Sequence, residues 1–273
     1  MRLDHSRMDA FWRNPERYRL TYECNLVPIT LDYGLSRGIS FHLIKEGKWH
    51  GLTDAECNVL VAQEVSDQQA VAVAWQMWRE WERQHAASGI KTLATEQEFD
   101  VPIEGSPHSI VGRLDEIVEW NGGLWVGEAK TANMKETLPK LLERWRTNKQ
   151  ADFVLIGAAH LGYAVEGVLV RAIVEKHPPI ILPVVVKRTS AELDRHRLAV
   201  HQTAELIEFM RASFGIDQPW PHLTGQWPCA VAGKCAYENL CGKVCGQWDT
   251  AEMEKFKRRE EHLELLKGAS GAV

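Results

Sequence analysis

The chain has 273 residues, of which 45% are hydrophobic and 25% are charged, and this composition excludes a wholly disordered protein. The formal net charge is -5, so the chain lacks the overall positive charge that indicates non-specific nucleic-acid binding, although a local basic patch is compatible with that balance. Neither an export signal nor a membrane-spanning stretch is readable, and we expect a cytoplasmic protein with no membrane partner.

The order of the predicted elements indicates an α/β protein. The expected elements are, in chain order, a helix over 6–22 with a break at Asn14-Pro15, a helix near 38–46, two helices within 54–87, strands over 93–101, 109–120 and 124–130, helices over 138–146 and 148–161, strands over 165–175 and 180–187, and helices over 189–214 and 250–267. This order predicts a central mixed sheet flanked by helices, with helical additions and a Cys-rich C-terminal segment. We expect one domain over residues 1–248 and a charged helix and tail over 249–273.

Two carboxylates on the second and third predicted strands are placed together by the turn between them. Asn121-Gly122 is typical of a two-residue hairpin turn, which sets the register of the two strands. In that register Asp115 faces Glu128, and Lys130 lies on the same face because side chains alternate along a strand. A three-residue turn would shift the register by one residue and separate the two carboxylates.

Neighbouring carboxylates repel each other, and a divalent cation between them removes the repulsion. Mg²⁺ or Mn²⁺ takes such oxygen ligands, and the carbonyl of Ala129 can supply another. A lysine such as Lys130 beside the cation can orient a bound water or stabilise a developing negative charge. The pattern therefore favours metal-dependent phosphodiester hydrolysis, although the same residues also fit a solvated ion cluster on an exposed sheet face.

Three sequence motifs lie on or before this hairpin, and a glutamine, Gln150, follows them in a predicted helix. The motifs are Gly38-Ile39-Ser40-Phe41-His42, Gly112-Arg113-Leu114-Asp115 and Glu128-Ala129-Lys130-Thr131. In order and interval they resemble the PD-(D/E)XK nuclease superfamily, in particular its RecB-like branch and the related phage exonucleases and CRISPR-associated nucleases. The resemblance covers about residues 6–241, and it departs from the family at Val154, where an aromatic residue is common.

The resemblance implies a restriction-endonuclease-like fold and a divalent-metal-dependent DNA nuclease, exonuclease-like, that acts in recombination, repair or phage DNA metabolism. It implies that Asp115 and Glu128 are metal ligands and that Lys130 positions the attacking water. DNA is the implied substrate, and a recombination or replication protein is a compatible partner. The alternative is a DNA-binding or scaffolding protein that retains the fold without hydrolysis, which the loss of any of these three residues would have favoured.

The resemblance adds three further residues to the site. His42 would be a metal ligand or a contact to the scissile phosphate, whereas its plain alternative is a helix histidine satisfied by a neighbour. Gln150 would be a further active-site residue, although a glutamine near a helix start is commonplace. The family's acidic residue before the hairpin corresponds to Glu96 or Glu98, and we prefer Glu96 as a metal ligand.

Four cysteines lie close together near the C-terminus: Cys229, Cys235, Cys241 and Cys245. Their spacing lacks the paired Cys-x-x-Cys knuckles of a zinc ribbon. The segment resembles the C-terminal cysteines of RecB-like nucleases that carry an iron–sulfur cluster, which implies a [4Fe–4S] cluster on the first three. Asn14-Pro15 stands where the family has a Cys-Pro ligand, so Cys24 or Cys245 would be the fourth ligand, and a degenerate cluster with free thiols is the alternative.

Positive side chains follow the third predicted strand. Lys140 and Arg144 share a helix face at i,i+4, and Lys149 lies nearby. We expect them to contact a nucleic-acid backbone, with Trp145 stacking on a base, although an ordinary solvated helix has the same spacing.

Overall fold

The computed structural model describes residues 1–29, 31–221, 236–237, 239–244 and 247–258. The chain divides into two compact units, each assembled from segments that are distant in the sequence. The first unit holds Met1–Thr30, Ile103–His108 and Leu198–Val273, and the second holds Leu31–Pro102 and Ser109–Arg197. The expected division of the chain at residue 248 stays a prediction.

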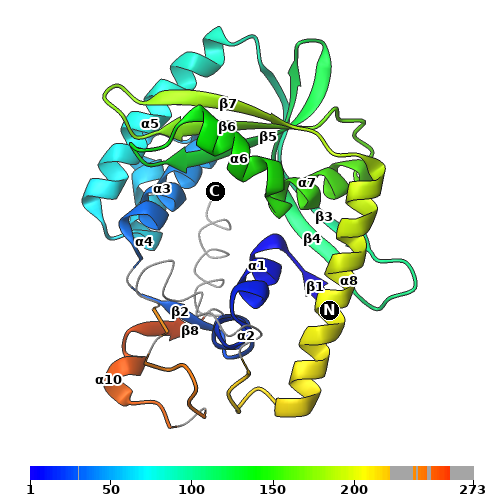
Figure 1. The fold of residues 1–273 in the computed structure, drawn as a ribbon. Helices are drawn as coiled ribbons and strands as arrows, with labels where there is room; N and C mark the ends of the chain where they lie inside the picture. The colour runs from blue at the N-terminus through cyan, green and yellow to red at the C-terminus, as the bar shows by residue number, and fades with distance from the viewer. Residues whose placement is uncertain (30, 222–235, 238, 245–246, 259–273) are drawn as a thin grey trace. The chain divides into compact units, whose positions relative to one another are not determined.

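The second unit is built on a mixed sheet in which the strands follow the order β3-β4-β5-β6-β7 (Figure 1). β5 and β6 are parallel, whereas the other neighbouring pairs in this order are antiparallel. The strands are β3 (Lys91–Pro102), β4 (Ser109–Trp120), β5 (Gly123–Ala132), β6 (Val168–Val174) and β7 (Ile180–Val186). The predicted α/β fold with a central mixed sheet is confirmed, and it is consistent with a restriction-endonuclease-like fold.

Helices cover both faces of this sheet (Figure 1). Ala129 of β5 packs in the core with α3 and α5, whereas Glu128, the residue before it, contacts Gln150 of α7. Because side chains alternate along a strand, these helices lie on opposite faces. The helices with residues in this unit are α3 (Tyr33–Trp49), α4 (Asp54–Glu64), α5 (Gln68–Ala87), α6 (Leu138–Thr147), α7 (Lys149–His160) and α8 (Ser190–Phe214), which contributes residues to both units.

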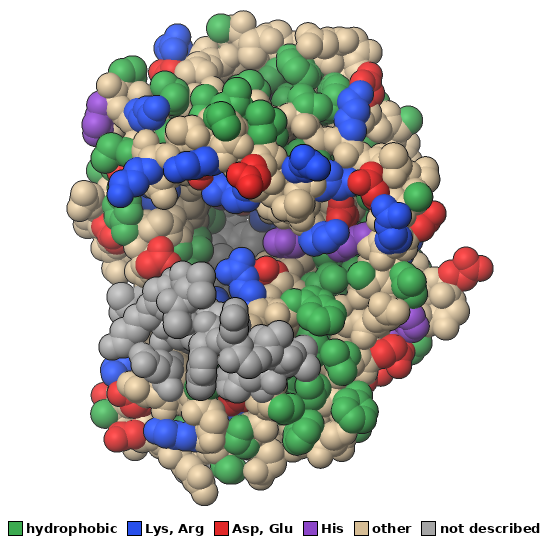
Figure 2. Space-filling model, viewed as in Figure 1, with side chains coloured by type: hydrophobic (Ala, Val, Ile, Leu, Met, Phe, Trp, Pro, Cys, Tyr) green, Lys and Arg blue, Asp and Glu red, His purple; other side chains and the backbone are tan. Residues whose placement is uncertain are grey.

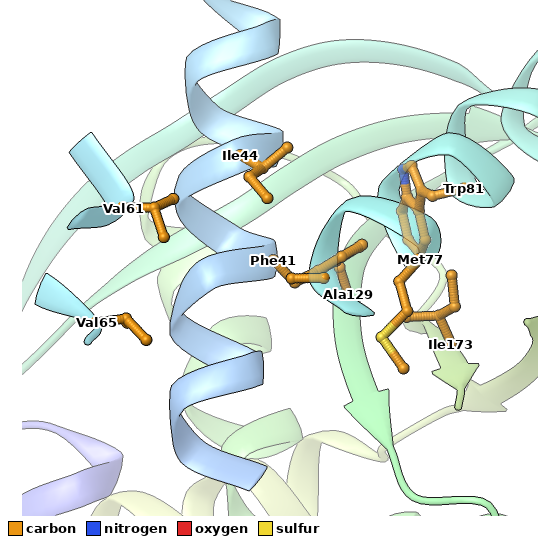
Figure 3. Packing of buried hydrophobic residues seen from close by; sticks show 9 residues of the cluster. Phe41, Ile44, Val61, Val65, Met77, Trp81, Ala129 and Ile173 are labelled. Atoms are coloured by element: carbon orange, nitrogen blue, oxygen red, sulfur yellow. The ribbon is translucent and has the colours of Figure 1, made fainter. Parts of the chain in front are cut away.

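A hydrophobic core fixes α3 against α5 and the sheet (Figure 3). Phe41 is fully buried and meets the ring of Trp81 edge-on, with ring centroids 5.7 Å apart. Met77 of α5 and Ile173 of β6 complete the contact. Each such side chain contributes about 1.5–3 kcal/mol on burial, and the anchored Phe41 fixes the position of its neighbour His42.

The first unit contains mostly short elements from the two ends of the chain. Asn14 caps α2 by accepting a hydrogen bond from the backbone N–H of Glu16, and Pro15 is the first residue of that helix. The predicted helix break at Asn14-Pro15 is thereby confirmed. The elements are β1 (Arg2–Leu3), α1 (His5–Arg13), α2 (Pro15–Tyr18), the π-helix η1 (Arg19–Glu23), β2 (Leu26–Pro28), α10 (Thr250–Met253) and β8 (Phe256–Arg258).

The prediction of a continuous helix over residues 250–267 is wrong in its described part. α10 ends at Met253, and β8 then pairs antiparallel with β2, with Leu26 opposite Arg258. Phe256 is buried, and its ring stacks on Tyr237 at 5.2 Å between centroids. Burial of this one aromatic side chain against β2 outweighs the helical preference of the charged residues around it.

No helix in the described part of the chain is long and apolar enough to cross a bilayer.

Candidate metal centre

The β4–β5 hairpin has the predicted two-residue turn. Asn121 and Gly122 have φ values of 51° and 78°, and two consecutive positive values are the signature of a type I′ turn. The turn pairs Trp120 with Gly123, and the ladder keeps this register along the strands. The predicted register is therefore confirmed.

Asp115 and Glu128 lie one residue beyond Glu116 and Gly127, the last pair of the ladder. Here the pairing of the two strands gives way to side-chain contacts. The Asp115 Oδ2 atom accepts a hydrogen bond from the backbone N–H of Ala129 at 3.3 Å. The structure thus brings both predicted carboxylates to the same end of the hairpin.

Glu128 is held by two side chains through one oxygen only. Lys130 Nζ lies 2.9 Å from Glu128 Oε2, and Gln150 Nε2 donates a hydrogen bond to the same oxygen at 2.9 Å. Asn148 caps α7 by accepting a hydrogen bond from the Gln150 N–H, which fixes Gln150 in the first turn. The other oxygen, Glu128 Oε1, is buried and has no hydrogen-bond partner in the described part of the protein.

Burial and charge set the protonation of these groups. Burial raises the pKa of Glu128 to about 7, the Asp115 carboxylate acts in the same direction, and Lys130 opposes both. Burial also disfavours ionised Asp115, but the Lys130 ammonium and the His42 ring bring the pKa of Asp115 below its ordinary value. For Lys130, Glu128 and Asp115 overcome the burial cost and raise its pKa above the ordinary value. Without a cation, Glu128 therefore titrates near neutral pH beside an ionised Asp115 and a protonated Lys130.

The centre fits a hard divalent cation. Mg²⁺ and Mn²⁺ prefer carboxylate oxygens, and the buried Glu128 Oε1 offers one that the described protein leaves unpaired. A cation would also relieve the repulsion between Asp115 and Glu128 that contributes to the raised pKa of Glu128. The carbonyl of Ala129 as a further ligand stays a prediction.

His42 of α3 lies near Asp115 and Lys130. Burial lowers its pKa to about 4, the Asp115 carboxylate partly opposes that shift, and Lys130 reinforces it. The ring is therefore neutral at neutral pH, which is the form that ligates metals. The placement agrees with the residue's expected position, and its role as a ligand stays a prediction.

Glu96 lies opposite Asp115 across the β3–β4 pair. Its neighbours Thr95 and Gln97 pair with Glu116 and Leu114, so the register places Glu96 beside Asp115. The backbone of Glu96 is left-handed, with φ 51°, which is uncommon for a residue with a side chain.

The pKa of the Glu96 carboxyl is also affected by the charges of the candidate centre. Burial raises its pKa to about 7, Arg113 opposes the shift, and Asp115 adds to it. Arg113 Nε lies 2.6 Å from Glu96 Oε2. Glu98, by contrast, is exposed on the same strand. The half-buried Glu96 therefore lies beside Asp115, and its role as a metal ligand stays a prediction.

Sequence reasoning missed a second ion cluster, formed by Lys45, Glu116 and Arg171 on the face of the sheet that carries α3 and α5. Lys45 Nζ lies 2.6 Å from Glu116 Oε1, and Arg171 Nη2 lies 2.7 Å from Glu116 Oε2. All three side chains are buried. Lys45 also contributes to the lowered pKa of Asp115. The spacing of Lys45 from His42, three residues on one helix, places Lys45 near the centre but does not indicate its contact with Glu116.

The predicted DNA-contacting residues are exposed on α6 and at the start of α7. Lys140, Arg144 and Lys149 are all exposed, and Lys and Arg side chains gather over α6 on the face that Figure 2 shows. Trp145, however, is 2% exposed and forms the buried stripe of α6 with Leu141. The expectation that Trp145 stacks on a base is therefore wrong, because its ring is a core contact.

Three of the predicted iron–sulfur ligands, Cys229, Cys235 and Cys245, lie outside the described residues. Cys24 is buried in a cluster that includes Tyr237 and Leu240 of the Cys-rich segment. Cys241 is half-buried. Over the described ranges, no group of cysteines is close enough to hold a metal.

The model of the PD-(D/E)XK nuclease superfamily matches residues 2–242. No curated protein sequence matches the chain. Among solved structures, the one titled "Crystal structure of SSO0001" is 15% identical, covers 75% of this chain and 76% of that chain, and has a TM-score of 0.38.

Proposed function

Because the chain belongs to the PD-(D/E)XK nuclease superfamily, we propose that it is a divalent-metal-dependent deoxyribonuclease. The observation that carries the proposal is the geometry of Glu128. One of its oxygens is held by Lys130 and Gln150, while the other is buried beside Asp115 and has no partner among the described residues. We further propose an exonuclease-like action of the RecB-like branch, in recombination, repair or phage DNA metabolism, with a recombination or replication protein as partner.

Asp115 and Glu128 would hold the Mg²⁺ or Mn²⁺ ion, with Ala129, His42 and Glu96 as further candidate ligands. The bound ion would polarise the scissile phosphate and lower the pKa of a water molecule.

Lys130 stays protonated because Glu128 and Asp115 raise its pKa. It therefore acts as a hydrogen-bond donor and a fixed positive charge, and not as a general base. In that form it can orient the attacking water or stabilise charge on the phosphate. Gln150 holds Glu128 Oε2 at 2.9 Å and so keeps the carboxylate aligned.

The rival proposal is a protein that binds DNA through the same fold without cleaving it. Asp115, Glu128 and Lys130 are all present, which favours the enzyme. The test is to incubate purified protein with labelled linear and circular DNA in Mg²⁺, in Mn²⁺ and in a chelator. We expect metal-dependent cleavage of linear DNA, and the absence of cleavage under every condition would leave the binding protein.

A [4Fe–4S] cluster is the second cofactor that we propose. Its support is the packing of Cys24 with Tyr237 and Leu240, which ties the N-terminal segment to the Cys-rich segment. We expect anaerobically purified protein to be brown, with iron and sulfide near four atoms per chain. Cys24→Ser and Cys245→Ser separate the candidate fourth ligands, because only the loss of the true ligand should bleach the protein. Colourless, iron-free protein would refute the cluster.

A further inference from the structure

A hollow of about 520 Å³ lies between the end of α3, the helix α5 and the edge strand β3. Its volume is within the range of about 300–1,000 Å³ that is usual for small-ligand sites. Three tryptophans line it, Trp49, Trp78 and Trp81, and so does Glu96 of the candidate metal centre. We call this hollow the tryptophan pocket. Because Glu96 lies opposite Asp115 in the sheet register, the pocket adjoins the candidate centre.

The three rings differ in what they can offer a ligand. Trp81 is buried, and the Arg171 guanidinium lies over its ring, 4.0 Å from the centroid, so this ring already makes a cation–π contact within the protein. Trp78 is half-buried. Trp49 is 49% exposed, at the end of α3. The aromatic surface available for stacking therefore belongs to Trp78 and Trp49.

The charges around the pocket favour a base over a phosphate. Lys45 is paired with Glu116 at 2.6 Å, and Lys48 forms an ion pair with Asp54. Glu46 and Glu82 also line the pocket, so its lining carries no excess of positive charge for a phosphate. Carboxylates accept hydrogen bonds from the amino groups of nucleobases, and aromatic rings stack on every base.

We propose that the tryptophan pocket receives an unpaired nucleobase of single-stranded DNA next to the scissile phosphate, an inference that rests on the proposed nuclease function. Trp78 and Trp49 stack on the base, and the polar lining contacts its edge. A base within a duplex is already stacked and paired, so it cannot enter without unpairing. The pocket therefore selects DNA with unpaired nucleotides at the cleavage point.

Trp78→Ala tests the proposal, and Trp75→Ala is its matched control. Trp75 lies one turn earlier on α5, is half-buried like Trp78 and packs on the same core, but it does not line the pocket. Trp49→Ala is the second test variant, because its exposed side chain is removed with little effect on folding. Thermal melting checks that all three variants are folded.

Binding is measured by anisotropy of a fluorescent single-stranded oligonucleotide in chelator, where no cleavage occurs. Trp78→Ala should raise the Kd by about tenfold, as expected for the loss of one base–aromatic stack, and Trp75→Ala should not change it. An oligonucleotide with 2-aminopurine at successive positions should lose fluorescence on binding wild type at one position, and less so on binding Trp78→Ala or Trp49→Ala. Binding of a blunt duplex should be equal in all variants.

Equal affinity of wild type, Trp78→Ala, Trp49→Ala and Trp75→Ala for single-stranded DNA would overturn the proposal that the pocket binds a base. So would an equal loss of affinity for single strands and for blunt duplex. Cleavage in Mg²⁺ is scored separately with the same proteins. If wild type cleaves DNA and the variants bind single strands as tightly as wild type, the base-binding role of the pocket is refuted and the nuclease function stands. If wild type never cleaves DNA, the proposed nuclease function is refuted.

Discussion

Two buried carboxylate clusters occupy the β4–β5 region, and they differ in how the protein compensates their charge. Glu116 has a cation on each oxygen, Lys45 on one and Arg171 on the other. These cations hold the pKa of Glu116 below its ordinary value although burial works against them. Glu128, one strand away, has one oxygen without a partner in the part of the chain that the structure describes, and its pKa is raised to about 7. Glu116 has a cation on both oxygens, so its loss would leave buried charges unpaired, whereas Glu128 has one lysine on one oxygen and leaves the other oxygen for a ligand.

The largest expected effect is on cleavage, when the candidate metal centre loses a carboxylate. Glu128→Ala or Asp115→Ala should lower the cleavage rate by about a thousandfold or more, since metal-assisted charge stabilisation is worth several kcal/mol. Thermal melting should show folded protein, because the change also removes the repulsion between the pair. Glu119→Ala, at an exposed position of β4, the strand of Asp115, is the control and should cleave DNA at the wild-type rate. Normal metal-dependent cleavage by both site variants would refute the assignment.

The compensated cluster should respond through stability. Glu116→Ala leaves Lys45 and Arg171 buried without their counter-charge, and we expect a loss of about 3–5 kcal/mol in the free energy of unfolding. Urea denaturation of Glu116→Ala and Glu128→Ala measures the contrast. A Glu116→Ala variant as stable as wild type would show that the two clusters do not differ as described.

Lys130→Ala separates catalysis from binding within the centre. Its ammonium should act mainly in the transition state, so turnover should fall by about a hundredfold or more while DNA affinity changes little. Single-turnover kinetics and anisotropy measure the two quantities. Weakened DNA binding with normal turnover would make Lys130 a phosphate contact instead.

The smallest expected effect is the pH dependence of stability without metal. Glu128 binds its proton more tightly in the folded protein, where its pKa is about 7, than in the unfolded chain, where it is about 4.5. Its contribution to stability is therefore present below about pH 4.5 and is lost as the pH rises to about 7. His42, with a folded pKa lowered to about 4 from 6.5, acts in the opposite direction over an overlapping range. The measurement is therefore the free energy of unfolding of wild type and of Glu128→Gln in chelator across this pH range. The variant should become increasingly more stable relative to wild type as the pH rises toward neutral. A constant difference would contradict the raised pKa.

Local rules predicted the hairpin that carries the centre. Asn121-Gly122 sets the type I′ turn, and the turn sets the register that brings Asp115 and Glu128 to one end of the hairpin. Side-chain alternation then places Lys130 with Glu128, which the structure joins at 2.9 Å. These inferences succeed because each depends on residues close together in the sequence.

The missed features depend on contacts between distant segments. The Glu116 cluster joins α3, β4 and β6, and no spacing in the sequence shows that Lys45 and Arg171 meet there. α3 also begins at Tyr33, earlier than the expected start near residue 38. Asp32 caps its N-terminus, and Arg37 pairs with Glu175 from another part of the chain. Such contacts override the low helix propensity of the glycines in this stretch.

Binding of Mn²⁺ tests the central claim most directly, because it does not depend on cleavage. Calorimetric titration of wild type near pH 7 should show Mn²⁺ binding with release of protons, since the ion displaces the proton of Glu128, whose pKa is about 7. Glu128→Ala should abolish this binding, whereas Glu119→Ala should keep it. Equal affinity and equal proton release in wild type and Glu128→Ala would contradict the account, because the ion would then bind elsewhere.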